Sequence, residues 1–202
     1  MIYKHLSKID LSKDLILPCR KGDLKALKNY ATVEDVNFEG DFSTQQTLYG
    51  LEGNKIYLLG LGETKDAVKI EEAFRKLCFD KKKYWKQSIQ VVADELSEHE
   101  IKKASIGLEL GTYEIGQFKS EKKKVQELTI NFCSKKDCSN SLIEGKYTGE
   151  IINRIKALVD APANHKTPEF LGNWAIESSK SSHYKCTVLH QDELKKQGFD
   201  AV

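Results

Sequence analysis

Short apolar segments alternate along this chain with stretches that repeat apolar residues at helical spacing. Ile56–Leu59 and Ile89–Ala93 are apolar throughout, which is typical of strands covered on both faces. Leu15–Leu17 predicts a third strand, which we expect to stop at Pro18. Val125–Cys133 alternates, so we expect a strand with one wetter face or a place near the edge of a sheet. Tyr184–Leu189 alternates too and predicts a further strand.

Helical patterns fill the intervals between these strands. Ile70–Leu77 carries apolar residues on one helical face. Ser97 and Glu100 fit a capping box, in which each side chain satisfies an orphan backbone N–H. The stripe behind them runs over Ile101–Ile115, and its small residues would let that helix lie close to a sheet. Strands alternating with helices predict an α/β fold with a mainly parallel sheet.

The last third of the chain predicts more helix. A third apolar stripe spans Tyr147–Val159, and Ser139–Lys146 before it has the composition of a linker. Thr167–Glu169 combines a hydroxyl cap, a proline and a carboxylate, which favours a helix start. Asp192 is expected to cap a short helix that ends at Gly198. Phe199–Val202 then predicts the beginning of another strand.

Composition places the chain among globular proteins without naming a partner. Of 202 residues, 31% are charged and 40% hydrophobic, which excludes collagen, long disorder and a disulfide scaffold. Lys and Arg total 32 against 30 Asp and Glu, so the charge is too near neutral to favour nucleic acid. No leader peptide or membrane segment is evident. Five scattered cysteines indicate reduced thiols, so we expect a cytoplasmic protein with no membrane partner.

Three patterns have features of a functional site, but none of them predicts such a site. Gly60-Leu61-Gly62 lies between a strand and a helix, where backbone N–H groups can hold a phosphate. The dinucleotide fingerprint needs a third glycine where Lys65 stands, so a tight turn is favoured. Cys133 and Cys138 lack the further ligands that zinc requires. The histidines show no metal or nucleophile signature; they are His5, His99, His165, His183 and His190.

A run near the end of the third helical stripe carries a resemblance. Residues 158–168 read Leu-Val-Asp-Ala-Pro-Ala-Asn-His-Lys-Thr-Pro. The run resembles the joint between the two domains of the leucyl aminopeptidases, the cytosol aminopeptidase or M17 family. There a helix ends in leucine, valine, asparagine, threonine, proline, alanine and asparagine, and Thr-Pro opens a new helix. This sequence departs in having Asp160 and Ala161 for the asparagine and threonine.

Two earlier segments agree with this family. Ile56–Glu63 resembles its hydrophobic strand ending in Gly-Leu-Gly, and Gly107–Lys122 resembles its segment of glycine, tyrosine, phenylalanine and lysine. The resemblance implies a three-layer, macro-like α/β N-terminal domain with a mainly parallel sheet over residues 1–145. It implies a linker helix and turn over 146–166, and the truncated start of a second, catalytic α/β domain over 167–202.

The same resemblance implies a function for the parent protein. It implies a hydrolase, a metalloaminopeptidase that removes N-terminal residues from peptides and forms a hexamer in the cytoplasm. Two divalent metal ions, manganese or zinc, would activate the attacking water. The motifs that hold those metals in the family are absent from these residues. We therefore expect no catalytic, cofactor-binding or metal-binding residue here, and no activity from the 202 residues alone.

One alternative stays open at this point. The chain could be a stand-alone, non-catalytic macro-like domain that binds a nucleotide or phosphate ligand at Gly60–Gly62, or that acts as a scaffold. The family resemblance instead gives this stretch a role in assembly and access to the active site. Binding of nucleic acid is not favoured by the scattered lysines.

Overall fold

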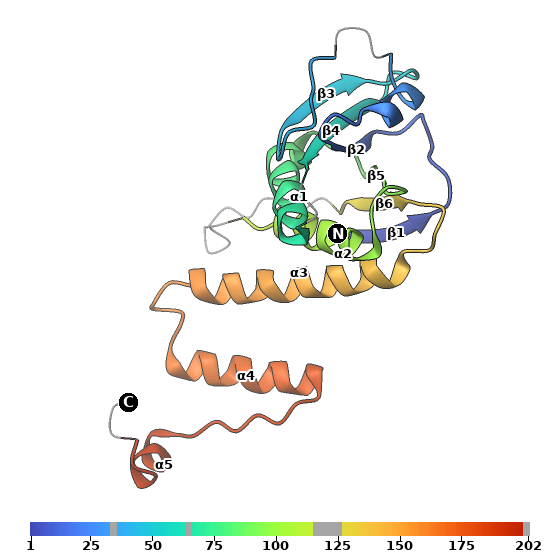
Figure 1. Ribbon diagram of the computed structural model, residues 1–202. Coiled ribbons are helices and arrows are strands. Elements are labelled where there is room, and N and C mark those ends of the chain that lie inside the picture. The colour runs from blue at the N-terminus through green and yellow to red at the C-terminus, as the bar shows by residue number, and fades with distance from the viewer. Residues whose placement is uncertain (33–35, 64–65, 115–126, 200–202) are drawn as a thin grey trace. The chain divides into compact units, whose positions relative to one another are not determined.

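The computed structural model describes residues 1–32, 36–63, 66–114 and 127–199 (Figure 1). The chain forms two compact units, Met1–Lys156 and Ala157–Val202, and each is described by itself. Among the described residues, no helix combines the length and the apolar character needed to cross a membrane.

The first unit is built on a six-stranded sheet. Its strand order is β1-β6-β5-β2-β4-β3, and only β3 runs antiparallel to its neighbour. The strands are β1 (Ile2–Leu6), β2 (Leu15–Arg20), β3 (Gln45–Tyr49), β4 (Lys55–Gly62), β5 (Ser88–Val92) and β6 (Thr129–Cys133). The predicted α/β class with a mainly parallel sheet is confirmed.

Pro18 does not end its strand, so that prediction was wrong. β2 continues to Arg20, and Pro18 pairs in register with Leu59 of β4. The ladder between β2 and β5 contains only Leu15 and Ile16 on the β2 side. Pro18 lies beyond that ladder, so its missing N–H interrupts no bond to β5.

The strand predicted over Val125–Cys133 forms only in part. β6 begins at Thr129, and residues 125–126 lie outside the described part of the chain. β6 lies next to the edge strand β1, so the expectation of a place near the edge of the sheet is confirmed. The wetter face is not seen, because Phe132 on one face is fully buried and Asn131 on the other is 7% exposed.

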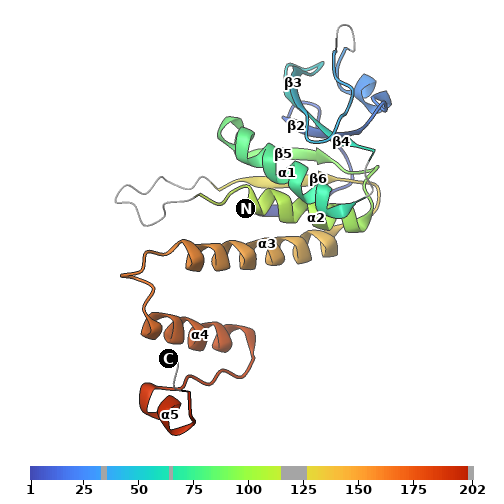
Figure 2. The same cartoon turned by 60° about the vertical axis from the view of Figure 1, so that its left-hand side comes forward.

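Two helices cover one face of the sheet. α1 (Ala67–Lys81) and α2 (Glu98–Leu110) lie side by side in both views (Figures 1 and 2). The predicted face of α1 is confirmed, since its four apolar residues are fully buried; they are Ile70, Ala73, Phe74 and Leu77. On the opposite face the 3₁₀ helix η1 (Lys25–Asn29) buries Leu27 against strand residues such as Leu15 and Leu17.

The capping box predicted at the start of α2 is present. The Ser97 Oγ accepts from the Glu100 N–H at 3.3 Å, and the Glu100 carboxylate accepts from the Ser97 N–H at 2.9 Å. The helix ends at Leu110, earlier than the stripe to Ile115 predicted, and Ile115 lies outside the described residues.

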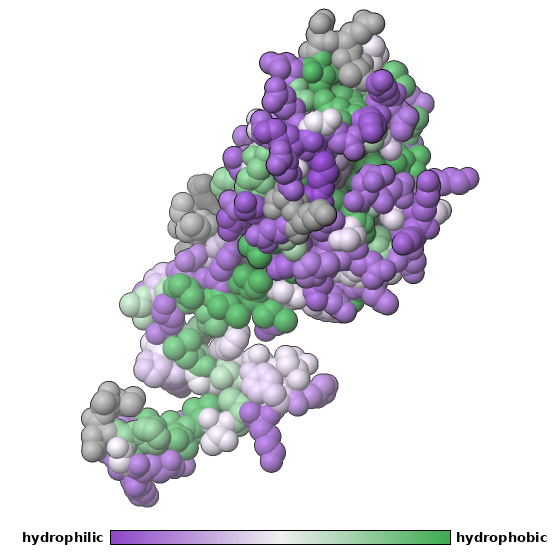
Figure 3. Space-filling view, in the orientation of Figure 1, coloured by the Kyte–Doolittle hydropathy of each residue, from purple (hydrophilic) through white to green (hydrophobic). Residues whose placement is uncertain are grey.

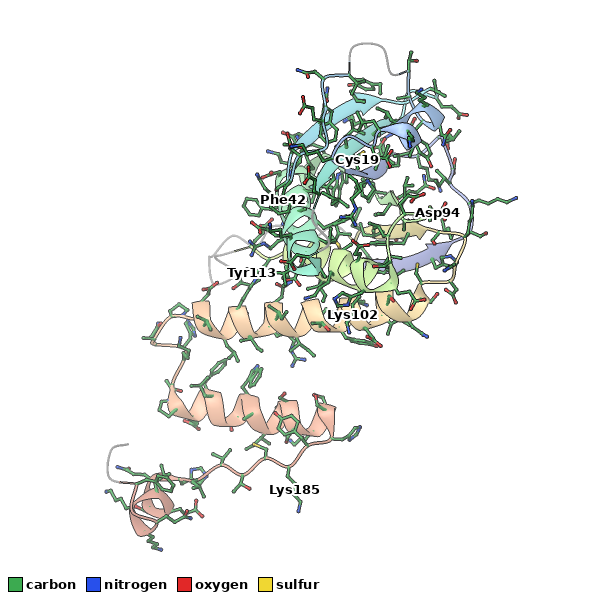
Figure 4. The ribbon with its side chains drawn as sticks, in the orientation of Figure 1. Cys19, Phe42, Asp94, Lys102, Tyr113 and Lys185 are labelled. Carbon is green, nitrogen blue, oxygen red and sulfur yellow. The ribbon has the colours of Figure 1, made fainter. Side chains whose placement is uncertain are left out.

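Glycines set how closely the helices pack. A Cβ on Gly107 of α2 would lie 2.2 Å from the Glu71 carbonyl oxygen of α1. A Cβ on Gly145 of α3 (Ser139–Asp160) would lie 2.6 Å from the Lys102 carbonyl oxygen of α2. Figure 4 shows Lys102 on the side of α2 that faces α3, and its Nζ lies 2.6 Å from the Glu144 carboxylate. Side chains at Gly107 and Gly145 would therefore force the helices apart.

One expectation about α3 was wrong. Ser139–Lys146 is no linker but the first turns of the helix, where the Asp137 carboxylate accepts from both the N–H and the Oγ of Ser139. The predicted apolar stripe lies on this helix and is largely exposed; its exposed members are Tyr147, Ile151, Ile155 and Val159. The buried residues of α3 are Leu142, Gly145 and Gly149, so the helix packs through its glycines.

The second unit contains α4 (Pro168–Ser182) and α5 (Gln191–Lys196). The predicted start of α4 is confirmed, since the Thr167 side chain accepts from the Phe170 N–H. Tyr184–Leu189 is not a strand, because among the described residues no neighbouring strand offers it a partner. His190, not Asp192, is the N-cap of α5. Residues 200–202 of the predicted final strand lie outside the described part.

Candidate functional site

The carboxyl edge of the parallel strands is the usual place for a ligand in an open α/β sheet. The predicted turn at Gly60–Gly62 lies there, but both glycines belong to β4. The Gly60 N–H donates to the Thr44 carbonyl at 2.9 Å, and the Gly62 N–H donates to the Gly40 carbonyl at 2.9 Å. A Cβ on Gly60 would lie 2.0 Å from the Asp41 carbonyl oxygen. These two N–H groups therefore already have partners, and the glycines admit a neighbouring backbone segment rather than a phosphate.

A charged pair closes the same edge. The guanidinium of Arg20, at the end of β2, donates to the Glu100 carboxylate at the start of α2. Partial burial opposes ionisation of Glu100, but the Ser97 N–H and hydroxyl together with Arg20 outweigh it and lower its pKa. Glu100 is therefore an ionised carboxylate whose hydrogen bonds cap α2 and tie it to β2. Such a group is poorly suited to act as a general base.

The four buried thiols are unsuited to nucleophilic or metal chemistry. All five cysteines are free, and Cys186 alone is not buried. Burial raises the pKa of Cys19 and Cys78 to about 12, and that of Cys133 and Cys138 to about 11. Thiols with such pKa values are protonated at neutral pH, whereas the thiolate is the reactive form.

A metal centre is not assembled by the described residues either. They contain no group of three or more His, Cys, Asp or Glu side chains able to hold an ion. His5 is engaged structurally, with Nε2 2.8 Å from the Ser134 carbonyl oxygen and Nδ1 3.4 Å from the Asp137 carboxylate. These residues do not fit a two-metal hydrolytic centre, which needs several convergent carboxylate or imidazole ligands.

A buried carboxyl group joins β1 to α2. Glu109 is 6% exposed, accepts a hydrogen bond from the Tyr3 hydroxyl at 3.1 Å and lies 3.9 Å from the Met1 ammonium. Burial raises the pKa of Glu109 above its usual value, although Met1 and Tyr3 oppose this. The protonated form is therefore better accommodated in the folded chain than the charged form.

This raised pKa predicts how stability changes with pH. A carboxyl group whose pKa is higher in the folded state stabilises the fold at low pH, and that contribution is lost as the pH rises through the folded pKa. We expect Glu109→Gln, which mimics the protonated form, to remove this loss, so that the variant gains stability relative to the natural chain as the pH rises above the ordinary glutamate pKa of about 4.3. Urea unfolding at several pH values measures the difference.

Glu144 provides a control of opposite sign. Its hydrogen bond and ion pair with Lys102 lower the pKa of the Glu144 carboxyl group. Its contribution is present above the ordinary pKa and is lost as the pH falls through the lowered one. Glu144→Gln should therefore lose stability at neutral pH and match the natural chain at low pH. The same pH response from both variants would contradict the assignment of Glu109.

A hollow with a volume of about 740 Å³ lies at the carboxyl ends of α1 and α2. Lys82, which belongs to the basic run Lys81–Lys83, lines this hollow. The Lys82 Nζ donates to the carbonyls of Gly111 at 3.2 Å and Thr112 at 3.0 Å, and pairs with Glu114 at 3.2 Å. It thereby satisfies carbonyls that the end of α2 leaves free. The second lysine run, Lys122–Lys124, lies outside the described residues.

α3 carries a stripe of exposed apolar side chains. Hydrophobic side chains gather along this helix in the space-filling view (Figure 3). Tyr147, Ile151 and Ile155 recur every fourth residue and are 60%, 54% and 49% exposed. A continuous apolar stripe on a surface helix marks an interaction face.

Comparison with known proteins relates the chain to one group of enzymes. No protein-family model matches it. It is 28% identical over 163 residues to a probable cytosol aminopeptidase of Clostridium perfringens, covering 73% of this chain and 33% of that protein. It is 29% identical over 184 residues to a probable cytosol aminopeptidase of Phytoplasma mali, covering 82% of this chain and 36% of that protein. The chain therefore spans about a third of the length of the curated relatives it matches.

Solved structures share the fold at lower identity. A mutant of tomato leucine aminopeptidase superposes with a TM-score of 0.79 at 17% identity, covering 97% of this chain and 46% of that one. The bottromycin maturation enzyme BotP in complex with Mn gives 0.73 at 14% identity, covering 94% and 40%. The resemblance to the leucyl, or cytosol, aminopeptidases that was expected from residues 158–168 is confirmed.

Proposed function

We propose that this chain, which resembles the N-terminal region of cytosol aminopeptidases, is the non-catalytic N-terminal part of a two-metal leucyl aminopeptidase. The parent enzyme would remove N-terminal residues from peptides in the cytoplasm and assemble as a hexamer. In this proposal the chain consists of a macro-like domain over 1–145, a linker helix and turn over 146–166, and the start of a catalytic domain over 167–202. The observation that supports this proposal is the sequence similarity to two probable cytosol aminopeptidases, which covers 73% and 82% of this chain.

The chemistry of the parent would lie in residues other than these. Two divalent ions, manganese or zinc, would polarise the scissile carbonyl and activate water when bound. The described residues do not supply a donor set for such a pair, since they hold no acidic or histidine cluster and their buried thiols are protonated. No step of peptide hydrolysis is therefore assigned to a residue of this chain.

The role that remains is assembly and control of access. The exposed stripe of α3 supports it, because an apolar helix face is stabilised when another surface covers it. The second unit has a similar feature, since Phe170 and Leu171 of α4 are each 41% exposed. We assign both faces to contacts with the remainder of the aminopeptidase.

An activity assay tests this proposal. The purified 202-residue chain should not hydrolyse leucine p-nitroanilide with Mn²⁺ at ~1 mM substrate, near the upper end of usual KM values. The protein produced from the whole gene should hydrolyse it under the same conditions. Steady turnover by the 202-residue chain would contradict the non-catalytic role. Absence of turnover by the longer protein, with Mn²⁺ or with Zn²⁺, would contradict the aminopeptidase assignment.

A further inference from the structure

From the hollow at the ends of α1 and α2 we infer a nucleotide-binding site, for a ligand that carries a base and at least two phosphates. The hollow is lined by five basic residues and two acidic ones, so its lining carries three net positive charges. The whole chain carries only two. The basic residues are Arg75, Lys76, Lys82, Lys83 and Lys156. Positive charge is therefore concentrated at this hollow, and a concave surface lined by one sign of charge attracts ligands of the opposite sign.

Of these five cations, Lys82 alone forms an ion pair within the described residues. Lys82 pairs with Glu114 and with the carbonyl end of α2. Within the described part of the chain, none of the other four forms an ion pair; they are Arg75, Lys76, Lys83 and Lys156. Lys82 offsets the partial negative charge that the end of α2 would otherwise present to an anion. The remaining donors are left for a ligand, and Arg75 offers the fork geometry that suits a phosphate.

Aromatic side chains lie among the same cations. Phe79 of α1 lines the hollow and is 64% exposed, which is unusual for phenylalanine. Tyr113, labelled at the end of α2 in Figure 4, lies opposite α3 with the Lys156 Nζ 5.7 Å from its ring centroid. An exposed aromatic face beside a basic groove is a stacking surface for a base. A nucleotide would contact both the aromatic side chains, through its base, and the cations, through its phosphates. A free phosphate would contact only the cations.

The hollow does not lie at the carboxyl edge of the parallel strands, where open α/β sheets usually bind ligands. The carboxyl edge of the strands is occupied by the segment that bonds Gly60 and Gly62. The hollow instead lies where α1 and α2 end, and these helices run back from the carboxyl edge. The inference is independent of the aminopeptidase assignment, because it uses only charges, volume and exposed rings of the first unit.

Titration with ATP tests the inference, with tripolyphosphate and adenosine as the two part-ligands. ATP should bind the chain more tightly than either, with a dissociation constant that rises between 50 and 200 mM salt. The double variant Arg75→Gln and Lys76→Gln should weaken ATP about tenfold or more, since two charge-assisted contacts are lost. The matched control Lys195→Gln and Lys196→Gln removes the same charge from exposed positions of α5 and should change binding less than about twofold.

A third variant separates a nucleotide from a simple anion. Phe79→Ala should weaken ATP and leave tripolyphosphate unchanged, and circular dichroism should show that each variant is folded. No saturable binding of ATP would overturn the inference, as would equal weakening by the two double variants. Equal affinity for ATP and tripolyphosphate, with Phe79→Ala affecting neither, would overturn the assignment to a nucleotide. None of these outcomes depends on peptidase activity, so failure here and failure of the proposed function are distinguishable.

Discussion

Replacing Gly107 by alanine should destabilise the first unit by about 3 kcal/mol, the upper part of the usual range for overpacking a core. The added methyl carbon would lie 2.2 Å from the Glu71 carbonyl oxygen and 3.0 Å from the Arg75 backbone nitrogen. Both are backbone atoms inside α1, so neither rotates away as the end of a side chain would. The two helices must separate, and their buried faces lose contact. Alanine's higher helix propensity, about 1 kcal/mol, recovers only part of this loss.

Urea unfolding can follow this unit separately from the second. The chain has two tryptophans, Trp85 buried in the first unit and Trp174 in the second. In a Trp174→Phe background, fluorescence reports the unfolding of the first unit. Gly172→Ala makes the same change inside α4 of the second unit, so it should leave this midpoint unchanged and thereby check that the fluorescence follows the first unit alone. An unchanged midpoint for Gly107→Ala would mean that α1 and α2 are not held at this close distance.

Local patterns predicted the helices that pack through large apolar side chains. Ile70 and Phe74 recur at helical spacing, and the sheet lies against them. Thr167 and Ser97 were identified because a cap is a short-range feature, complete within four residues. Such signals depend on neighbours in sequence, so they could be read without knowing the fold.

The features of the fold that local patterns did not predict depend on residues that are far apart in sequence. Nothing near Gly60 and Gly62 in the sequence shows that Thr44 and Gly40 supply their hydrogen-bond partners, so the strand end was mistaken for a turn. The α3 helix packs through Gly145 and Gly149, which add no hydrophobic signal, whereas most of the larger apolar residues of its stripe stay exposed. The edge strands β1 and β3 were not predicted, because exposed edges need no continuous apolar run.

The candidate site shows the same limit. The sequence shows a basic run at Lys81–Lys83 but gives no reason to place Lys156 or Tyr113 beside it. Only the packing of α1, α2 and α3 assembles these groups around one hollow. The near-neutral total charge of the chain gave no sign of the local excess of five basic over two acidic residues at this hollow.

Replacing Phe74 by alanine should have a still larger effect on the same unit, about 3–5 kcal/mol. Phe74 is fully buried in the cluster between α1 and the sheet, among residues such as Tyr57, Ile89 and Leu108. Truncation removes most of an aromatic side chain and leaves a cavity that close-packed neighbours fill only in part. The loss is comparable with the total stability of many domains, so the variant is expected to be largely unfolded at 37 °C.

Phe79→Ala provides the matched control for this prediction. It makes the same substitution on the same helix, five residues later, at a side chain that is 64% exposed. Surface truncations away from special features change stability by less than about 0.5 kcal/mol, so its midpoint should match the natural chain. Urea unfolding followed through Trp85, in the Trp174→Phe background, compares the two variants directly. Equal midpoints would show that α1 does not present its Phe74 face to the sheet, and would remove the basis for the hollow at its end.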